Sequence, residues 1–254
     1  MNSLYGTVRL VSEDSLWFFG RLLFLYITVP LTLIWLLIGY LFEIGNDVVV
    51  VISGPTYFFI AFFGIAGFKS LFPIVIGLGS TRTQFLKVFY GVSILGVGLS
   101  ILLLNLLQRI LKAVFLQWDI HSTIMHPGLF LVNEYHFFTY LWIDLMLGLF
   151  LIGIPFFLYC IHYRLGISKR LVILMLLSFV TLLLYYGGYL QNSIEWMMGL
   201  DLEAIKMNLI TVLGLCGIGA FLLTYPIMRN ASLKPKEIAM KFAFILLASK
   251  SSVI

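Results

Sequence analysis

Several apolar stretches, each of about 20 residues, constrain this chain more than any other feature of its sequence. A helix needs roughly 20 consecutive apolar residues to cross the hydrocarbon core of a bilayer. Inside that core, backbone N–H and C=O groups must be paired within the protein, which favours helices. The stretches are continuously apolar and lack the alternation that a transmembrane β-barrel would need. The sequence therefore predicts an all-α membrane protein.

Six stretches of this kind predict six transmembrane helices. Residues 2–19 come before them, and Leu4, Val8 and Val11 recur there at helical spacing, which is typical of an N-terminal helix lying in the membrane interface. No repeat or linker divides the chain, so we expect residues 1–254 to form a single transmembrane domain. The predicted spans are residues 22–42, 48–68, 88–107, 137–161, 171–190 and 208–228.

The charged residues predict how these spans are oriented. With both termini in the cytoplasm, 13 of the 16 Lys and Arg residues lie on the cytoplasmic side. Cytoplasmic loops of membrane proteins carry such an excess, so we expect a multi-pass protein of the cell membrane with cytoplasmic N and C termini. The net charge of +5 is scattered among loops and is not gathered on a face with interleaved aromatic residues. This argues for membrane lipid as a partner and against nucleic acid.

Residues 71–87, between the second and third predicted spans, form a polar and basic connection that glycines interrupt. Gly79 permits backbone angles that other residues resist. Ser80 and Thr81 offer hydroxyl caps to the free amides of a new helix that begins near Arg82. The sequence thus predicts a short cytoplasmic helix that lies across the membrane face and is exposed for docking.

This connection resembles a motif of a known family, the Gly-x-[Ser/Thr]-Arg turn of ABC-2-type transporter permeases. In that family the turn lies between the second and third spans and couples to a cytoplasmic ATP-binding subunit. The resemblance implies a coupling helix at the same place in this chain. The residues that carry it are Gly79, Ser80, Thr81, Arg82, Gln84 and Phe85.

The resemblance also implies a function and partners. The chain would be the permease subunit of an ATP-driven exporter, forming the substrate path with a second permease subunit, identical or related. Two ATP-binding subunits beneath the membrane would drive alternating access. The chain has no G-x4-G-K-[ST] phosphate loop, so ATP hydrolysis is expected in a separate chain. We expect no catalytic residue and no cofactor in this one.

Asp144 is the one acidic residue that lies inside a predicted span. Ionisable groups within a membrane are costly to bury and are often functional. Asp144 could therefore lie on the substrate path. Its place about two turns from the outer end of the span favours a structural hydrogen bond instead, with a partner such as Tyr140.

The predicted outer loop between the third and fourth spans gathers histidines and carboxylates, which are possible zinc ligands. Their spacing does not match H-E-x-x-H, because His121 and His126 are five residues apart and no Glu follows either. Histidines and acids in a solvated loop need no special role, so we expect no metal site. The residues concerned are Asp119, His121, His126, Glu134 and His136.

Two other functions stay open from the sequence. A non-transport membrane protein, such as a sensor, immunity or assembly subunit, would use the small residues of the spans for helix packing and would need no polar path. A membrane-embedded, metal-dependent enzyme would use the outer loop. No G-x-S-x-G motif supports hydrolytic chemistry in such an enzyme.

Overall fold

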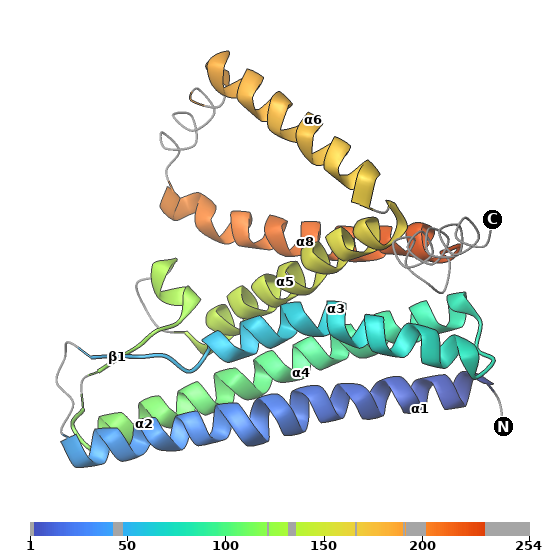
Figure 1. Cartoon of the computed structure of the whole chain (residues 1–254). Helices are drawn as coiled ribbons and strands as arrows, with labels where there is room; N and C mark the ends of the chain where they lie inside the picture. Colours follow the sequence, from blue (N-terminus) through green and yellow to red (C-terminus); the bar gives the residue numbers. More distant parts are fainter. Residues whose placement is uncertain are drawn as a thin grey trace, which may run out of the picture.

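The computed structural model describes residues 3–42, 48–120, 122–131, 136–165, 167–189, 191 and 202–231, and these are mostly helical. Five of their helices are long and apolar enough to cross a membrane, which agrees with the predicted all-α membrane protein. The candidate spans are Leu4–Phe42, Gly54–Gly77, Arg82–Gln117, Phe137–Leu165 and Met207–Met228. A further helix, α6 (Ile167–Tyr186), covers most of the fifth predicted span and extends away from the other helices (Figure 1).

The first span and the predicted interfacial helix form one continuous helix, built from α1 (Ser3–Ser15), η1 (Leu16–Thr28) and α2 (Val29–Phe42) (Figure 1). The helix predicted over residues 2–19 is therefore present, but it is not separate from the first span. No proline separates the two parts, and the wide turns of η1 join them: the N–H of Val29 donates to the carbonyl of Phe24, five residues back. At about 1.5 Å per residue, 39 residues exceed the roughly 30 Å hydrocarbon core.

The second span begins and ends later than predicted. Val49–Val50 form strand β1 instead of helix, and β1 pairs in parallel with β2 (Thr123–Ile124). Helix α3 then runs from Gly54 to Gly77. Pro55 occupies its first turn, where a proline costs little because its missing N–H would have no helical partner.

The predicted short coupling helix is not a separate element. Helix α4 (Arg82–Gln117) is continuous over 36 residues, about 54 Å, and takes in both the 82–87 segment and the third span. The segment contains no proline that could end the helix before the bilayer. A turn at residues 78–81 therefore joins two long antiparallel helices directly.

The elements that follow α4 include the helix that packs against both α3 and α4. After β2 come η2 (Pro127–Phe130), α5 (Phe137–Leu165), α6 and α8 (Leu202–Met228), with α5 and α8 packed closely against each other (Figure 1). Buried aromatic rings fill the space between α3, α4 and α5. Close packing matters here because lipid tails are as apolar as the side chains and give helices little reason to associate. The phenylalanines of this core include Phe63, Phe68, Phe72, Phe85, Phe89 and Phe156.

Candidate functional site

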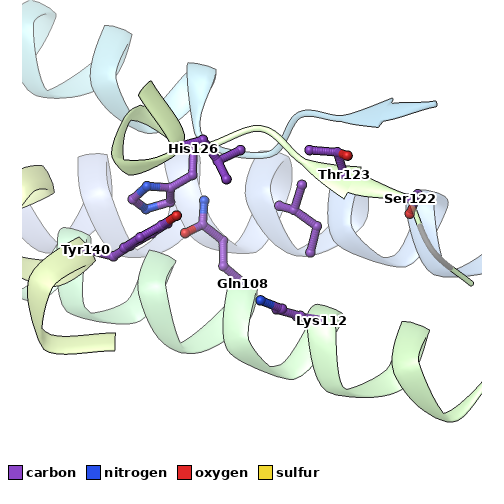
Figure 2. A pocket seen from close by; sticks show the side chains of 8 residues that line it. Gln108, Lys112, Ser122, Thr123, His126 and Tyr140 are labelled. Atoms are coloured by element: carbon purple, nitrogen blue, oxygen red, sulfur yellow. The ribbon is translucent and has the colours of Figure 1, made fainter. Parts of the chain in front are cut away.

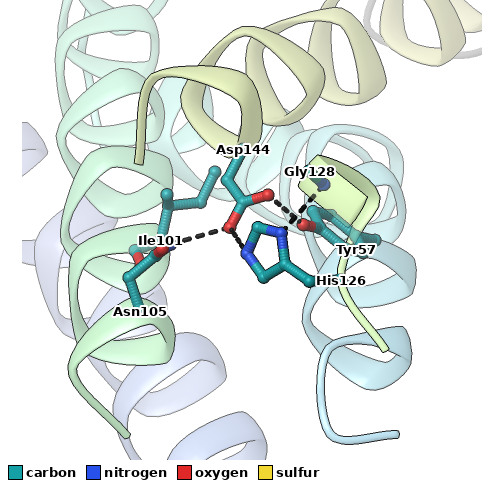
Figure 3. A network of polar contacts seen from close by, with 6 residues as sticks. All are labelled: Tyr57, Ile101, Asn105, His126, Gly128 and Asp144. Atoms are coloured by element: carbon teal, nitrogen blue, oxygen red, sulfur yellow. Dashed lines mark hydrogen bonds and ion pairs between the residues drawn. The ribbon is translucent and has the colours of Figure 1, made fainter. Parts of the chain in front are cut away.

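Asp144 is the centre of a buried polar network. It lies near the start of α5 and its side chain is 0% exposed. Its Oδ1 accepts a hydrogen bond of 2.6 Å from Tyr57 Oη on α3, and its Oδ2 accepts one of 2.7 Å from Asn105 Nδ2 on α4 (Figure 3). The Nε2 atom of His126 lies 2.8 Å from the same Oδ2. One carboxylate thus joins three helices and the segment that connects α4 to α5.

The proton of the His126 ring is positioned by its neighbours. The Nδ1 atom accepts a hydrogen bond of 2.9 Å from the backbone N–H of Gly128, so a neutral imidazole carries its proton on Nε2, facing Asp144 (Figure 3). One ring nitrogen thus accepts a hydrogen bond, and the other faces the carboxylate. His126 has no nitrogen left to take a proton from a nucleophile, which argues against a hydrolytic role at this position.

The segment carrying His126 is folded back into the helical domain. The N–H of Met125 donates to the carbonyl of Val50 at 2.8 Å, next to the paired strands. The His126 ring then packs on the ring of Tyr140, with centroids 4.5 Å apart. Gly128 allows this approach, because a Cβ there would lie 3.0 Å from three atoms of Tyr140. The sequence predicts a solvated loop at His126, whereas the side chain is buried.

The network satisfies the demands of a buried carboxylate. A charge in a low-dielectric interior needs hydrogen-bond donors or an opposite charge, and Asp144 faces three donor groups. Asn105 also donates to the carbonyl of Ile101 at 3.0 Å, which holds its amide toward Asp144. The predicted partner Tyr140 is wrong: the tyrosine that bonds Asp144 is Tyr57, and Tyr140 instead supports His126.

A pocket of about 160 Å³ adjoins this network on the side of α4 (Figure 2). Polar side chains from α4, from the 122–126 segment and from α5 surround it. Asp144 is not among the residues that line the pocket, whereas His126 and Tyr140 are. The polar and aromatic lining residues are Gln108, Lys112, Ser122, Thr123, His126 and Tyr140.

The predicted coupling residues lie at the opposite end of α3, where it ends in a Schellman motif. The N–H of Ser80 donates to Val75 and that of Gly79 to Ile76, while Gly79 adopts a φ of +91°. Helix α4 begins at Arg82, as predicted. Thr81 and Gln84 form a capping box: each side chain accepts from the other's backbone N–H at 3.2 Å.

Gly79→Ala should destabilise the protein by about 1–2 kcal/mol, because a Cβ at positive φ crowds the following carbonyl oxygen. Gly77→Ala is the matched control. Its Cβ would also meet nothing within 4 Å, but its backbone is helical, so we expect no loss. Unfolding of both variants in detergent measures the difference. Equal stabilities would contradict the strain at Gly79.

The six predicted coupling residues differ in what they can contact. Ser80 is buried, and its Oγ accepts a hydrogen bond of 2.8 Å from Thr7 Oγ1. This bond attaches α1 to the turn. Phe85 is 0% exposed and packs among Phe68, Phe72 and Phe89, so it supports the turn from inside and cannot touch a partner. The residues left at the surface or half-buried are Gly79, Thr81, Arg82 and Gln84.

The structure brings no metal site together within the residues it describes. His121 and Glu134 of the predicted outer loop lie outside those residues. Among the described ones, no group of three or more His, Cys, Asp or Glu side chains could hold a metal ion.

No protein-family model, curated protein or solved structure matches this chain. Its class therefore follows from the fold and the site. The chain is a membrane-embedded helical protein with a buried carboxylate network near one end of its helices and a capped interhelical turn at the other.

Proposed function

We propose that the chain is the permease subunit of an ATP-driven, ABC-2-like exporter of a cell membrane. The turn at residues 78–84 docks a separate ATP-binding subunit, and a second permease subunit completes the substrate path. The observation that carries the proposal is the turn itself. Its Gly-x-[Ser/Thr]-Arg sequence resembles the coupling turn of that family, and it joins the two helices that reach the Asp144 network at their other ends.

The packing around the turn supports a mechanical role. Phe72 on α3 lies 5.6 Å, centroid to centroid, from Phe85 on α4, and the Thr7–Ser80 hydrogen bond adds α1 to the same unit. A force on the turn would therefore move α1, α3 and α4 together. Coupled motion of this kind, between two arrangements of packed helices, is how nucleotide-driven closure would reach the far side of the membrane.

The surface of the turn supports a docking role. Leu78 is 69% exposed and Ile74 is 51% exposed, next to the basic side chain of Arg82. The helix ends around the turn also carry Lys69 and Lys87, which favours a cytoplasmic position for this end and for both termini. In that orientation the apolar tip would face water unless a protein partner covered it.

Arg82→Glu should lower the amount of bound ATP-binding subunit by about tenfold or more while leaving membrane insertion intact, since it reverses the charge at the contact. Lys87→Glu is the matched control, because Lys87 is exposed five residues further along α4. Gentle purification from the native membrane, followed by mass spectrometry and by ATPase assays of the reconstituted complex, gives the readout. An Arg82→Glu variant that keeps a stoichiometric P-loop partner and full ATPase coupling would show the docking assignment to be wrong.

A non-transport membrane subunit, such as a sensor or assembly factor, is the second candidate. The observation that favours it is the complete burial of Asp144, whose carboxylate faces three donor groups of the protein. A carboxylate on a substrate path would have to open to that path during transport. Purification that preserves known complexes but yields no P-loop partner would favour this second function.

A further inference from the structure

We propose that the face formed by η1 and α4 binds a transmembrane helix of a different protein, which carries an acidic residue opposite Arg21. The contact does not depend on docking at the 78–84 turn. If the exporter proposal holds, the partner is its second permease subunit, which is then a related chain and not an identical one.

The helix that contains η1 runs alongside α4 in the same direction (Figure 1). At one end, Thr7 bonds to Ser80 just before α4 begins. At the other end, a Cβ on Gly39 would lie 3.1 Å from the ring of Phe115. Residues of the two helices that contact each other between these points therefore lie at the same depth in the membrane.

The packing of η1 on α4 gives the depth of Arg21. Residues 88–108 of α4 carry no charged side chain and extend about 32 Å, close to the roughly 30 Å of the hydrocarbon core. A Cβ on Gly96 would lie 2.9 Å from the ring of Phe19, so Phe19 is level with a point about 12 Å into this segment. Arg21 lies about 3 Å further along, near the middle of the core. Apolarity alone predicts a span that begins just after Arg21, at residue 22.

Within the residues that the structure describes, Arg21 has no partner. Its side chain is exposed, and no hydrogen bond or ion pair joins it to another described residue. A charged side chain at this depth is costly in lipid and is normally paired with an opposite charge. Arg9, near the start of the same helix, is paired in this way with Glu13. The group that completes Arg21 is therefore an anion.

A groove of about 300 Å³ between η1 and α4 extends past the level of Arg21. Gly20 lines it, and a Cβ there would meet nothing within 4 Å, so another helix can approach closely. The volume is about twice that of a roughly 150 Å³ cavity that holds benzene, so the groove accepts about two large side chains. A helix about 10–12 Å across lies over such a groove and inserts side chains into it. Exposed leucines of the lining supply apolar contacts, namely Leu16, Leu95 and Leu99.

Charge and depth together select the partner. A second copy of this chain does not supply the acid, because Asp144 is the one acidic residue in the predicted spans and its carboxylate is buried and bonded within its own copy. A lipid phosphate lies at the membrane surface, whereas Arg21 lies near the middle of the core. A transmembrane helix of another protein can place a carboxylate at that depth.

Purification of the tagged chain from its native membrane in a gentle detergent tests the contact. Arg21→Gln should lower the amount of the copurified membrane partner about tenfold or more, whereas Arg21→Lys, which keeps the charge, should retain most of it. Arg9→Gln is the matched control, because Arg9 is exposed but already paired. Slow maleimide labelling of the buried Cys160 checks that each variant is folded.

The sequence of the partner gives the decisive readout. Mass spectrometry should identify a protein with an Asp or Glu inside a transmembrane segment. Exchanging the two charges, with Arg21→Glu and the partner's acid changed to arginine, should restore the complex. The proposal would be overturned by a partner without such an acid, by a complex that Arg21→Gln leaves intact, or by a chain that copurifies with no membrane protein other than its own copies. Loss of bound phospholipid as the sole effect of Arg21→Gln would overturn it too. The exporter proposal fails separately, through the absence of a P-loop protein.

Discussion

Asp144→Ala should lower the free energy of unfolding by about 3–5 kcal/mol, the usual cost of removing one side of a buried charged interaction. The substitution leaves Tyr57 Oη and Asn105 Nδ2 without their acceptor, and the His126 Nε2 proton without the oxygen it faces. Each such orphaned donor costs about 1–3 kcal/mol when water cannot reach it. Equilibrium unfolding in mixed micelles, followed by helical circular dichroism, measures the loss.

Two further variants distinguish the stability contributed by the hydrogen bonds of Asp144 from the effect of removing a carboxylate charge. Asp144→Asn keeps the shape but replaces one acceptor oxygen with a donor, so we expect a smaller loss of about 1–3 kcal/mol. Glu13→Ala removes an exposed carboxylate whose ion pair with Arg9 measures 2.7 Å, and should leave stability nearly unchanged. Similar effects of Asp144→Ala and Glu13→Ala would mean that the network does not hold the helices together.

The helical membrane fold could be predicted from the sequence because long apolar runs permit few other structures. Helix boundaries were predicted less well. Apolarity reports which residues tolerate lipid, and a helix can continue past the bilayer on either side, as it does over Arg82–Gln117. Where a boundary carries a local signal it was found: Thr81 caps α4, as its position before Arg82 indicated.

The candidate site was predicted only in part. Asp144 stood out because a lone acid in an apolar span is unusual, but its bond to Tyr57 spans 87 positions and depends on how α3 packs against α5. One signal was missed, since Asn105 and Gln108 lie three residues apart on one side of α4 next to an apolar run. The burial of His126 had no comparable signal. It depends on the pairing of β1 with β2 and on the close approach of Gly128 to Tyr140.

The close crossing of α5 and α8 gives the second large effect. Gly153→Ala on α5 should destabilise the protein by about 3 kcal/mol, at the upper end of the usual cost of over-packing. A Cβ at Gly153 would overlap the backbone of Gly217 on α8, lying 2.6 Å from its carbonyl carbon. Backbone atoms cannot rotate away, so α5 and α8 would have to separate. Small residues are what allow such approaches between helices in lipid.

Gly219→Ala on α8, two residues beyond Gly217, is the matched control, because its Cβ would meet nothing within 4 Å and alanine favours a helix by about 0.5–1 kcal/mol. The thiol of Cys160 reports on the separation directly. Cys160 lies on α5, seven residues beyond Gly153, and is buried, whereas Cys216 is exposed and can first be replaced by serine. Maleimide labelling of Cys160 should become faster in Gly153→Ala and stay slow in Gly219→Ala. Equal protection in both variants would mean that α5 can shift along α8 without opening the core, and that the glycine contact does not fix the position of the helix that carries Asp144.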